Sequence, residues 1–595
     1  MPMNAMRLNV DDGLPHPASR RGSKASDEAG PSMSEEMTED IFSEDISSSK
    51  HVHIEDIIGV IPLEVFPSTS GYDNPAYDMM GDDDQSKSSP PSHQLPTASP
   101  LVIPPLQPVN SSSLCLEFVI MAAALSQISI GATVTWPHVL RSHLASNSTN
   151  FYNTEMHLSS NQLNLANYLL LAGVVAGLAP SGWMVAGLGR SISLIVAALA
   201  GISSWALNAL APSATVLLVE RFLAGFTATM LKVSVTTYVM EVSVVSDRGL
   251  VLAYLQVMEV LGSLLCLTLN HWLHWTYIGF AYLGLLVLVC SAFLFFPESP
   301  VYLLMQRKEE KARGVLHRLR AKDTDVEVEL QWIKRYDTKE KRQSEFLSLF
   351  KRPLIDYTVT LVGLAVLAVS SGSAIITSSM KRMLLAPRPI MSGKTAMMTM
   401  VGALGAGKLV LAHLTDRMGR RLCLLLSLML LVLAYSVVGA MDYASASYLN
   451  VDPLTSTREA TDAMQVNQYS LMVPMSWAVV RACFLVLSVV SLGLGLDTVP
   501  TMLAVEYFPA HFRPQGLSVF LIASSLLQAF SMFLQSLMDE TLTMPGLFWT
   551  LAAFALLGIF YTNLGVYEIN SRTLKAPDLL QCFFRENFYE PRPIT

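Results

Sequence analysis

The segment Asp416-Arg417-Met418-Gly419-Arg420-Arg421 separates two long apolar runs and indicates how the whole chain is organised. A related segment, Gly182-Trp-Met-Val-Ala-Gly-Leu-Gly189-Arg190, separates two apolar runs nearer the N-terminus. Glycine permits a tight turn between adjacent helices, and charges at the helix ends can pair with carboxylates on a neighbouring helix. The recurrence predicts a chain built from two related halves.

Suitable carboxylates also occur in duplicate. Glu241 and Arg248 lie in YVMEVSVVSDRG, and Glu506 and Arg513 lie in VEYFPAHFRPQG. Each glutamate precedes its arginine by seven residues, so the second motif repeats the first. This spacing supports an internal repeat.

The composition places most of the chain in lipid. Of 595 residues, 51% are hydrophobic and only 15% are charged. Soluble proteins carry about 25% charged residues, so an ordinary globular enzyme is excluded. No nucleophile-base set, metal-ligand cluster or phosphate loop stands out, and we expect no enzymatic activity, metal or cofactor.

Apolar stretches long enough to cross a bilayer recur from Leu114 onward. They predict an all-α membrane protein with twelve transmembrane helices in two six-helix bundles. The helices should begin near residues 114, 163, 190, 214, 249, 275, 354, 394, 421, 476, 514 and 544. The predicted parts are a disordered cytoplasmic tail (1–112), an N-terminal bundle (113–300), a cytoplasmic helical linker (301–353), a C-terminal bundle (354–567) and a cytoplasmic C-terminal tail (568–595).

The charge distribution predicts the orientation. Residues 1–114 hold 18 acidic and 6 basic residues, so the acidity belongs to the tail, and nucleic acid is not expected as a partner. Residues 307–352 hold 14 basic and 9 acidic residues. By the positive-inside rule this segment is cytoplasmic, which places both termini in the cytosol. No terminal sorting signal is present, so we expect the plasma membrane.

Two short motifs lie outside the helices. Asn147-Ser-Thr is a glycosylation sequon in the first predicted extracellular loop. Asn74-Pro-Ala-Tyr77, in the N-terminal tail, resembles the motif that phosphotyrosine-binding and clathrin-adaptor domains read, although four-residue matches also arise by chance.

Across residues 114–575 the chain resembles the sugar porters of the major facilitator superfamily, which include facilitative glucose transporters and insect facilitated trehalose transporters. Gly131 and Trp136-Pro137 are more similar to the trehalose branch. The remaining matches are Arg221, Tyr238-x-x-Glu241 with Arg248-Gly249, Pro297-Glu-Ser-Pro300, Asp416 to Arg421, Glu506-Tyr-Phe-Pro509 with Arg513, and Glu568 with Arg572-Thr-Leu574.

The resemblance implies two bundles that rock around a central site. It also implies a cytoplasmic gate of paired charges, formed by Arg190, Glu241, Arg248, Asp416, Arg417, Arg421, Glu506 and Arg513. The alternative is that these charges only fix helix ends. The N-terminal turn departs from the family, because Ala186 and Gly187 stand where an Asp-Arg pair is expected.

The resemblance assigns substrate contacts to Gln256, Gln528 and Pro500. Side-chain amides suit sugars because they both donate and accept hydrogen bonds. Three further amides of the family are absent from residues 368–374, and Ser378, Ser379 and Thr501 replace aromatic residues. Loss of these contacts argues against glucose as the substrate.

Charges occupy the helices instead. Lys232, Glu259 and Asp497 lie at membrane depth, where a charge is costly and needs a cavity and a partner. We expect Lys232 and Glu259 to form an ion pair that binds a polar substrate or couples a proton; the alternative is a structural pair. Glu220-Arg221 and Arg481 are expected near the outer surface, with their charged groups reaching water.

These observations predict a transporter of a small polar solute working by alternating access, with trehalose or a related sugar favoured. The lost amides and new charges keep a second hypothesis open, an organic ion or other small metabolite, with or without a proton. A third is a solute sensor that does not transport.

Overall fold

The computed structural model describes residues 113–145, 148–322, 325–337, 349, 354–373, 390–448 and 474–566. Asn147, Asn74 to Tyr77, Ser378, Ser379 and the motif at Glu568 to Leu574 lie outside these residues.

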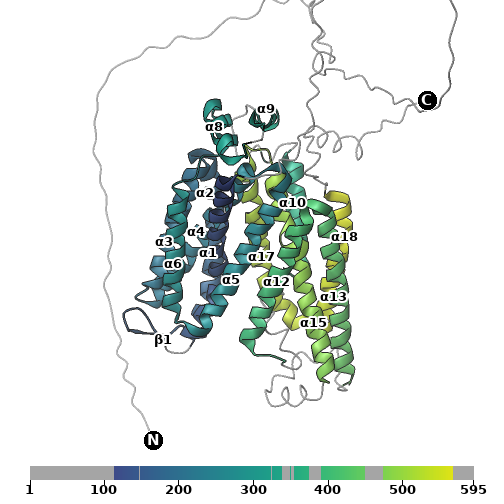
Figure 1. Cartoon of the computed structure of the whole chain (residues 1–595). Helices are drawn as coiled ribbons and strands as arrows, with labels where there is room; N and C mark the ends of the chain where they lie inside the picture. Colours follow the sequence, from purple (N-terminus) through teal and green to yellow (C-terminus); the bar gives the residue numbers. More distant parts are fainter. Residues whose placement is uncertain are drawn as a thin grey trace, which may run out of the picture. The chain divides into compact units, whose positions relative to one another are not determined.

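The first half of the body holds six long helices, shown in Figure 1. A two-stranded antiparallel hairpin, β1 (Ser148–Thr149) and β2 (Glu155–Met156), follows the first helix. The helices are α1 (Leu114–Leu144), α2 (Ser160–Leu188), α3 (Arg190–Ala209), α4 (Ala214–Val242), α5 (Arg248–Trp272) and α6 (Trp275–Phe293), with a short 3₁₀ turn, η2 (Val245–Asp247), before α5.

The second half repeats this pattern with one interrupted helix. Its elements are α10 (Leu354–Ser370), α12 (Gly393–Met418), α13 (Arg420–Tyr448), α15 (Met475–Ser491), η4 (Leu492–Leu496), α16 (Val499–Glu506), α17 (Arg513–Thr541) and α18 (Met544–Gly565). Within the described residues, ten helical segments are long and apolar enough to cross a membrane, and α10 and α17 fill the positions of the seventh and eleventh predicted spans. Every predicted helix start lies within three residues of an observed one.

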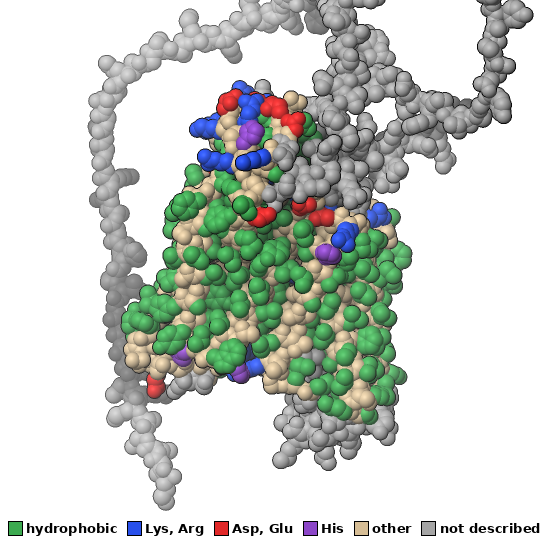
Figure 2. Space-filling model, in the orientation of Figure 1, with side chains coloured by type: hydrophobic (Ala, Val, Ile, Leu, Met, Phe, Trp, Pro, Cys, Tyr) green, Lys and Arg blue, Asp and Glu red, His purple; other side chains and the backbone are tan. Residues whose placement is uncertain are grey.

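Three short helices connect the halves, α7 (Pro300–Met305), α8 (Glu309–Leu319) and α9 (Val326–Asp337). Arg320 fastens them to the body, because one guanidinium nitrogen donates to the Val242 carbonyl at 2.9 Å and another pairs with Glu329 at 2.7 Å. We call the end of the body that carries these helices the linker end (Figure 1). In Figure 2 charged side chains gather there, while apolar side chains cover the helices below.

The apolar exterior is what lipid requires. Large apolar side chains such as Trp183 on α2, Leu288 on α6 and Leu564 on α18 are exposed. Helices satisfy their own backbone hydrogen bonds, so they can remain in a bilayer with such a surface. The chain is therefore a multi-pass membrane protein.

Glycines bring α1 and α5 into backbone contact. A Cβ atom at Gly131 would lie 1.7 Å from the Glu259 carbonyl oxygen, and one at Gly262 would lie 2.0 Å from the Ile128 carbonyl oxygen. Small residues drive such close packing in membranes, where the hydrophobic effect does not hold helices together. This contact also fixes the backbone that carries Glu259.

The expectation that Glu220-Arg221 and Arg481 reach the outer surface is wrong. The Glu220 and Arg221 side chains are both 1% exposed and pair at 2.6 Å, and Asn208 donates to Glu220 at 3.0 Å. Arg481 forms a buried ion pair with Asp442. Each charge finds an opposite charge inside its bundle, which costs less than exposing it to lipid.

We predict that Gly262→Leu will lower the thermal unfolding temperature by several degrees, because the side chain would force α1 and α5 apart and overpacking costs about 1–3 kcal/mol. Gly284→Leu is the matched control, since a Cβ atom at Gly284 would meet nothing within 4 Å. Thermal unfolding of the detergent-solubilised variants measures the difference. Equal shifts would contradict a role of Gly262 in packing.

Candidate transport path and linker-end ion pairs

The two turn motifs adopt the same backbone conformation. Gly189 has φ 97° and Gly419 has φ 91°, values that favour glycine. In each half the next residue, Arg190 or Arg420, is the first residue of the following helix. The two arginines are therefore equivalent, and both are almost fully buried.

In the first half, Arg190 pairs with Glu241 through Nη2 and Oε1 at 2.9 Å, with both side chains at most 1% exposed. Ser299 donates to the other carboxylate oxygen of Glu241 at 2.5 Å. Glu298 accepts from the backbone N–H of Arg190 at 2.8 Å, so a carboxylate caps the start of α3. The ring of Tyr302 on α7 lies 4.7 Å from the Arg190 guanidinium carbon, which joins the linker to this pair.

In the second half the partner of Glu506 is Arg420, at 2.8 Å, a residue that the predicted gate does not include. Arg421 instead donates to the Asn563 carbonyl oxygen at 2.7 Å. A helix advances about 100° per residue, so neighbouring arginines point in different directions. The Gly-Arg dipeptide shared with Gly189-Arg190 was the sequence signal for the correct residue.

Several contacts at the linker end join one half to the other. Arg513 lies 3.7 Å from the Glu241 carboxylate, and Arg248 interacts electrostatically with Glu506. The Leu250 backbone N–H donates to Asp416 at 2.7 Å. The predicted gate residue Arg417 is exposed on α12.

The equivalent contact on the other side of the body contains no carboxylate. Gly249 lets Asp416 approach, since a Cβ atom there would lie 2.2 Å from the carboxylate. At the end of α2, Gly182 lies instead against Ser518 and the backbone of α17, and Ala186 stands where Asp416 stands in α12. The halves therefore meet through a charged contact at α12 and α5 and through close packing at α2 and α17.

Halfway along the body, Lys232 and Glu259 form the ion pair expected from the sequence. The ammonium nitrogen lies 3.0 and 2.9 Å from the two carboxylate oxygens. Lys232 is on α4 and Glu259 is on α5, so both belong to the first half. This pair is partly accessible, with side-chain exposures of 21% and 15%.

The second half contributes a pair that the sequence reasoning missed. Lys408 on α12 lies 2.7 Å from Asp497, and its side chain is 5% exposed. The signal was present, because Lys408 is an ionisable residue in an apolar helix, as Lys232 is. Asp497 was singled out without its partner.

Asp497 directly follows the π-helix η4. Its backbone N–H bonds to the Leu492 carbonyl five residues earlier at 3.0 Å, and the Ser427 hydroxyl accepts from the Leu496 N–H at 3.2 Å. Pro500, one residue into α16, has no N–H to place in this irregular turn. Such wide turns are frequent at functional sites.

A small cavity lies between the halves, next to these pairs. It is lined by Thr236, Leu252, Leu255, Gln256, Thr501 and Met502. Gln256 is one turn before Glu259 on α5, and Thr236 is one turn after Lys232 on α4. Gln528 is exposed on α17, and its described hydrogen bond is made by the backbone carbonyl, which accepts from Ser531.

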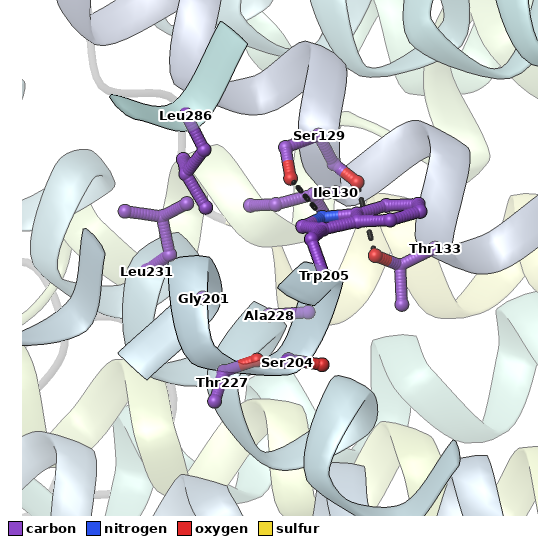
Figure 3. A pocket seen from close by; sticks show the side chains of 10 residues that line it. All are labelled: Ser129, Ile130, Thr133, Gly201, Ser204, Trp205, Thr227, Ala228, Leu231 and Leu286. Carbon is purple, nitrogen blue, oxygen red and sulfur yellow. Dashed lines mark hydrogen bonds between the residues drawn. The ribbon is translucent and has the colours of Figure 1, made fainter. Parts of the chain in front are cut away.

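A second cavity, drawn in Figure 3, lies inside the first half. Trp205 donates to the Ser129 hydroxyl at 2.8 Å along one wall, and Thr133 donates to the Ser129 carbonyl at 3.0 Å. All of its lining residues come from α1, α3, α4 and α6. Its space suffices for about one water molecule, as does that of the cavity between the halves. Because its lining comes from one bundle alone, it is not part of a path between the halves.

The model of the sugar (and other) transporter family matches residues 122–579. The chain belongs to the sugar (and other) transporter family. The match covers both halves of this family member. It includes the two turn motifs and the two ion pairs, Lys232 with Glu259 and Lys408 with Asp497.

Relatives of this family member include the facilitated trehalose transporter Tret1 of Drosophila virilis, 26% identical over 68% of this chain and 42% of the relative. The facilitated glucose transporter member 8 of Bos taurus is 24% identical over 70% of this chain and 85% of the relative. The chain thus spans less than half the length of that trehalose transporter.

Solved structures show the fold. The major facilitator superfamily proton:xylose symporter XylE bound to 6-bromo-6-deoxy-D-glucose superposes with a TM-score of 0.62 at 17% identity, covering 78% of this chain and 98% of that one. The inward-open structure of XylE from E. coli gives a TM-score of 0.52 at 17% identity, with coverages of 78% and 99%. The chain therefore has the major facilitator fold.

We predict that Arg420→Ala will destabilise the protein strongly, because Glu506 is 6% exposed and would lose its partner. Breaking a buried ion pair from one side costs about 3–5 kcal/mol. Arg421→Ala, one residue away, leaves that pair intact and should have a much smaller effect. The thermal unfolding temperatures of the two variants provide the comparison, and similar losses would show that Arg420 has no special role.

Proposed function

We propose that this chain carries a small polar solute, a carbohydrate, across a membrane by alternating access. The observation that carries the proposal is the set of contacts joining the two halves at the linker end, from Glu241 to Arg513 and from Asp416 to Leu250. Arg513 and Glu241 are buried in the described conformation, while the Asp416 side chain is 20% exposed. When the halves part and water reaches these charges, such pairs contribute only about 0 to 1 kcal/mol, so contacts of this kind can open and close. Of the predicted gate residues, five take part in contacts between the halves: Glu241, Arg513, Asp416, Arg248 and Glu506.

The linker end is the cytoplasmic end in this proposal. Residues 307–352 are rich in lysine and arginine, which the positive-inside rule assigns to the cytosol. In this proposal the described conformation is the one in which the cytoplasmic gate is closed. Both termini would then be cytoplasmic.

A carbohydrate is supported by family membership and by the relatives that are trehalose and glucose transporters. Gln256 is 7% exposed beside the cavity between the halves and offers both donors and an acceptor to hydroxyl groups. Trehalose or a related sugar is the favoured substrate.

Uptake of labelled trehalose and glucose into proteoliposomes containing the full chain tests the proposal. Saturable uptake above that of empty vesicles is expected. Uptake of organic ions alone would replace the carbohydrate with a charged metabolite. Specific sugar binding without flux would instead support a sensor.

Three further features of this proposal concern the cell. Asn147 would carry glycan on the outer side, the protein would reside in the plasma membrane, and the motif at Asn74 to Tyr77 would bind an adaptor protein. Glycosidase treatment tests the first, and surface labelling of wild type and Tyr77→Ala tests the other two. Unchanged surface abundance in the variant would dismiss the adaptor.

We predict that Asp416→Asn will make the linker end open more often, because it removes the charge from a hydrogen bond between the halves. The reporter is Thr501→Cys, in the small cavity between the halves. The exposed Cys115 and Cys483 are first replaced by serine. The rate at which the new cysteine reacts with a water-soluble thiol reagent then measures opening. Reaction from the linker side should rise about fivefold. Ala186→Ser, at the matching position of α2, should leave the rate unchanged. A rate unaffected by Asp416→Asn would refute the gate.

A further inference from the structure

The two mid-depth ion pairs lie at one level of the body. Lys232 is ten residues from the linker end of α4, and Glu259 is eleven from that end of α5. Lys408 is ten residues from the linker end of α12, and Asp497 is nine from the end of α16. At about 1.5 Å per residue, each lies roughly 15 Å from the linker end of its helix, near the middle of a bilayer.

The pairs also face each other across the boundary between the halves. Glu259 interacts electrostatically with Lys408, and Lys232 interacts with Asp497. Packing agrees, because a Cβ atom at Gly405, one turn before Lys408, would lie 3.1 Å from the side chain of Val260, the neighbour of Glu259. We call these four residues the charge quartet.

Three of the four quartet side chains keep accessible surface. Asp497 has 39% of its side-chain surface exposed although it lies at mid-depth, while Lys408 behind it is 5% exposed. Lys232 and Glu259 keep smaller accessible areas. The accessible groups are therefore carboxylate oxygens and one ammonium group. Gln256, one turn before Glu259 on α5, lines the small cavity between the halves.

The quartet carries no net charge, because it contains two lysines and two carboxylates. A cationic or anionic solute would leave one charge uncompensated at a depth where unpaired charges are costly. An uncharged solute keeps the balance. The presence of charges at this site thus argues against an ionic substrate.

Hydroxyl groups match what the quartet offers. They donate to carboxylate oxygens and accept from ammonium groups, and such charge-assisted hydrogen bonds are roughly twice as strong as neutral ones. A few of them can replace several amides. The quartet can therefore take over the role of the amides that the family carries and that residues 368–374 lack. The solute can still be an uncharged sugar.

We propose that the charge quartet is the substrate contact for an uncharged polyhydroxylated solute and that it excludes charged analogues of the same size. Asp497 and Glu259 accept from hydroxyls, Lys232 donates to them, and Lys408 holds Asp497 in place. The proposal rests on the proposed function and specifies its substrate class.

Full-length protein in proteoliposomes tests the selectivity with four labelled probes: trehalose, glucose, glucosamine as a cation and glucuronate as an anion. Equilibrium binding of the same probes to the detergent-solubilised protein separates recognition from flux. We expect an uncharged sugar to bind and cross, and the charged analogues to do neither.

Two variants test the quartet itself. Asp497→Asn leaves Lys408 uncompensated, so affinity for the uncharged sugar should fall about tenfold and glucuronate should become a better competitor. The double variant Lys408→Met/Asp497→Asn restores the charge balance, so glucuronate should be excluded again while the sugar still binds weakly. Asp356→Asn, at the start of α10, is the matched control and should match wild type.

The outcomes distinguish a failure of the quartet inference from a failure of the proposed transport function. Transport of charged analogues in place of uncharged sugars would overturn the inference and leave transport intact. Sugar binding that weakens in Asp497→Asn without any flux would support the quartet and overturn transport. Unchanged affinity and selectivity in Asp497→Asn would make the quartet a purely structural cluster, and that result would overturn the inference.

Discussion

A charge placed at membrane depth must have a partner, and most of this structure follows from that requirement. Arg190 with Glu241 and Arg420 with Glu506 close the linker end of each half, while the charge quartet holds the centre. Each pair joins two different elements of the fold. In a bilayer the hydrophobic effect does not hold helices together, so ion pairs and glycine contacts share that task.

The two turn motifs make different contacts between the halves at the linker end. Both place an arginine directly after a glycine of positive φ, but only the second half adds the carboxylate of Asp416. The first half packs small residues at the matching position, Gly182 and Ala186. At the matching turns, one contact between the halves is therefore a charge-assisted bond and the other is close packing. Arg513 and Glu241 add a buried charged contact between α17 and α4.

The helices could be predicted because spanning a bilayer requires a long apolar run, and such runs are visible in one sequence. The pairing of Lys232 with Glu259 was also predictable once both were placed on facing helices. Lys408 was missed because its partner follows an irregular turn that no simple period describes. Arg420 is absent from the predicted gate because sequence proximity does not fix which way a side chain points. Glu220 was misplaced because one sequence does not show that Asn208, on the neighbouring helix α3, faces it.

The π-helix between α15 and α16 has a consequence for how this helix can change over time. Five residues occupy a turn there, so removing one would rotate Asp497 relative to the preceding helix by about 100° and take it away from Lys408. A single-codon deletion would therefore disconnect the quartet while leaving its four residues in the sequence. The spacing of residues 492–496 is as much a determinant of the site as the identities of its charges.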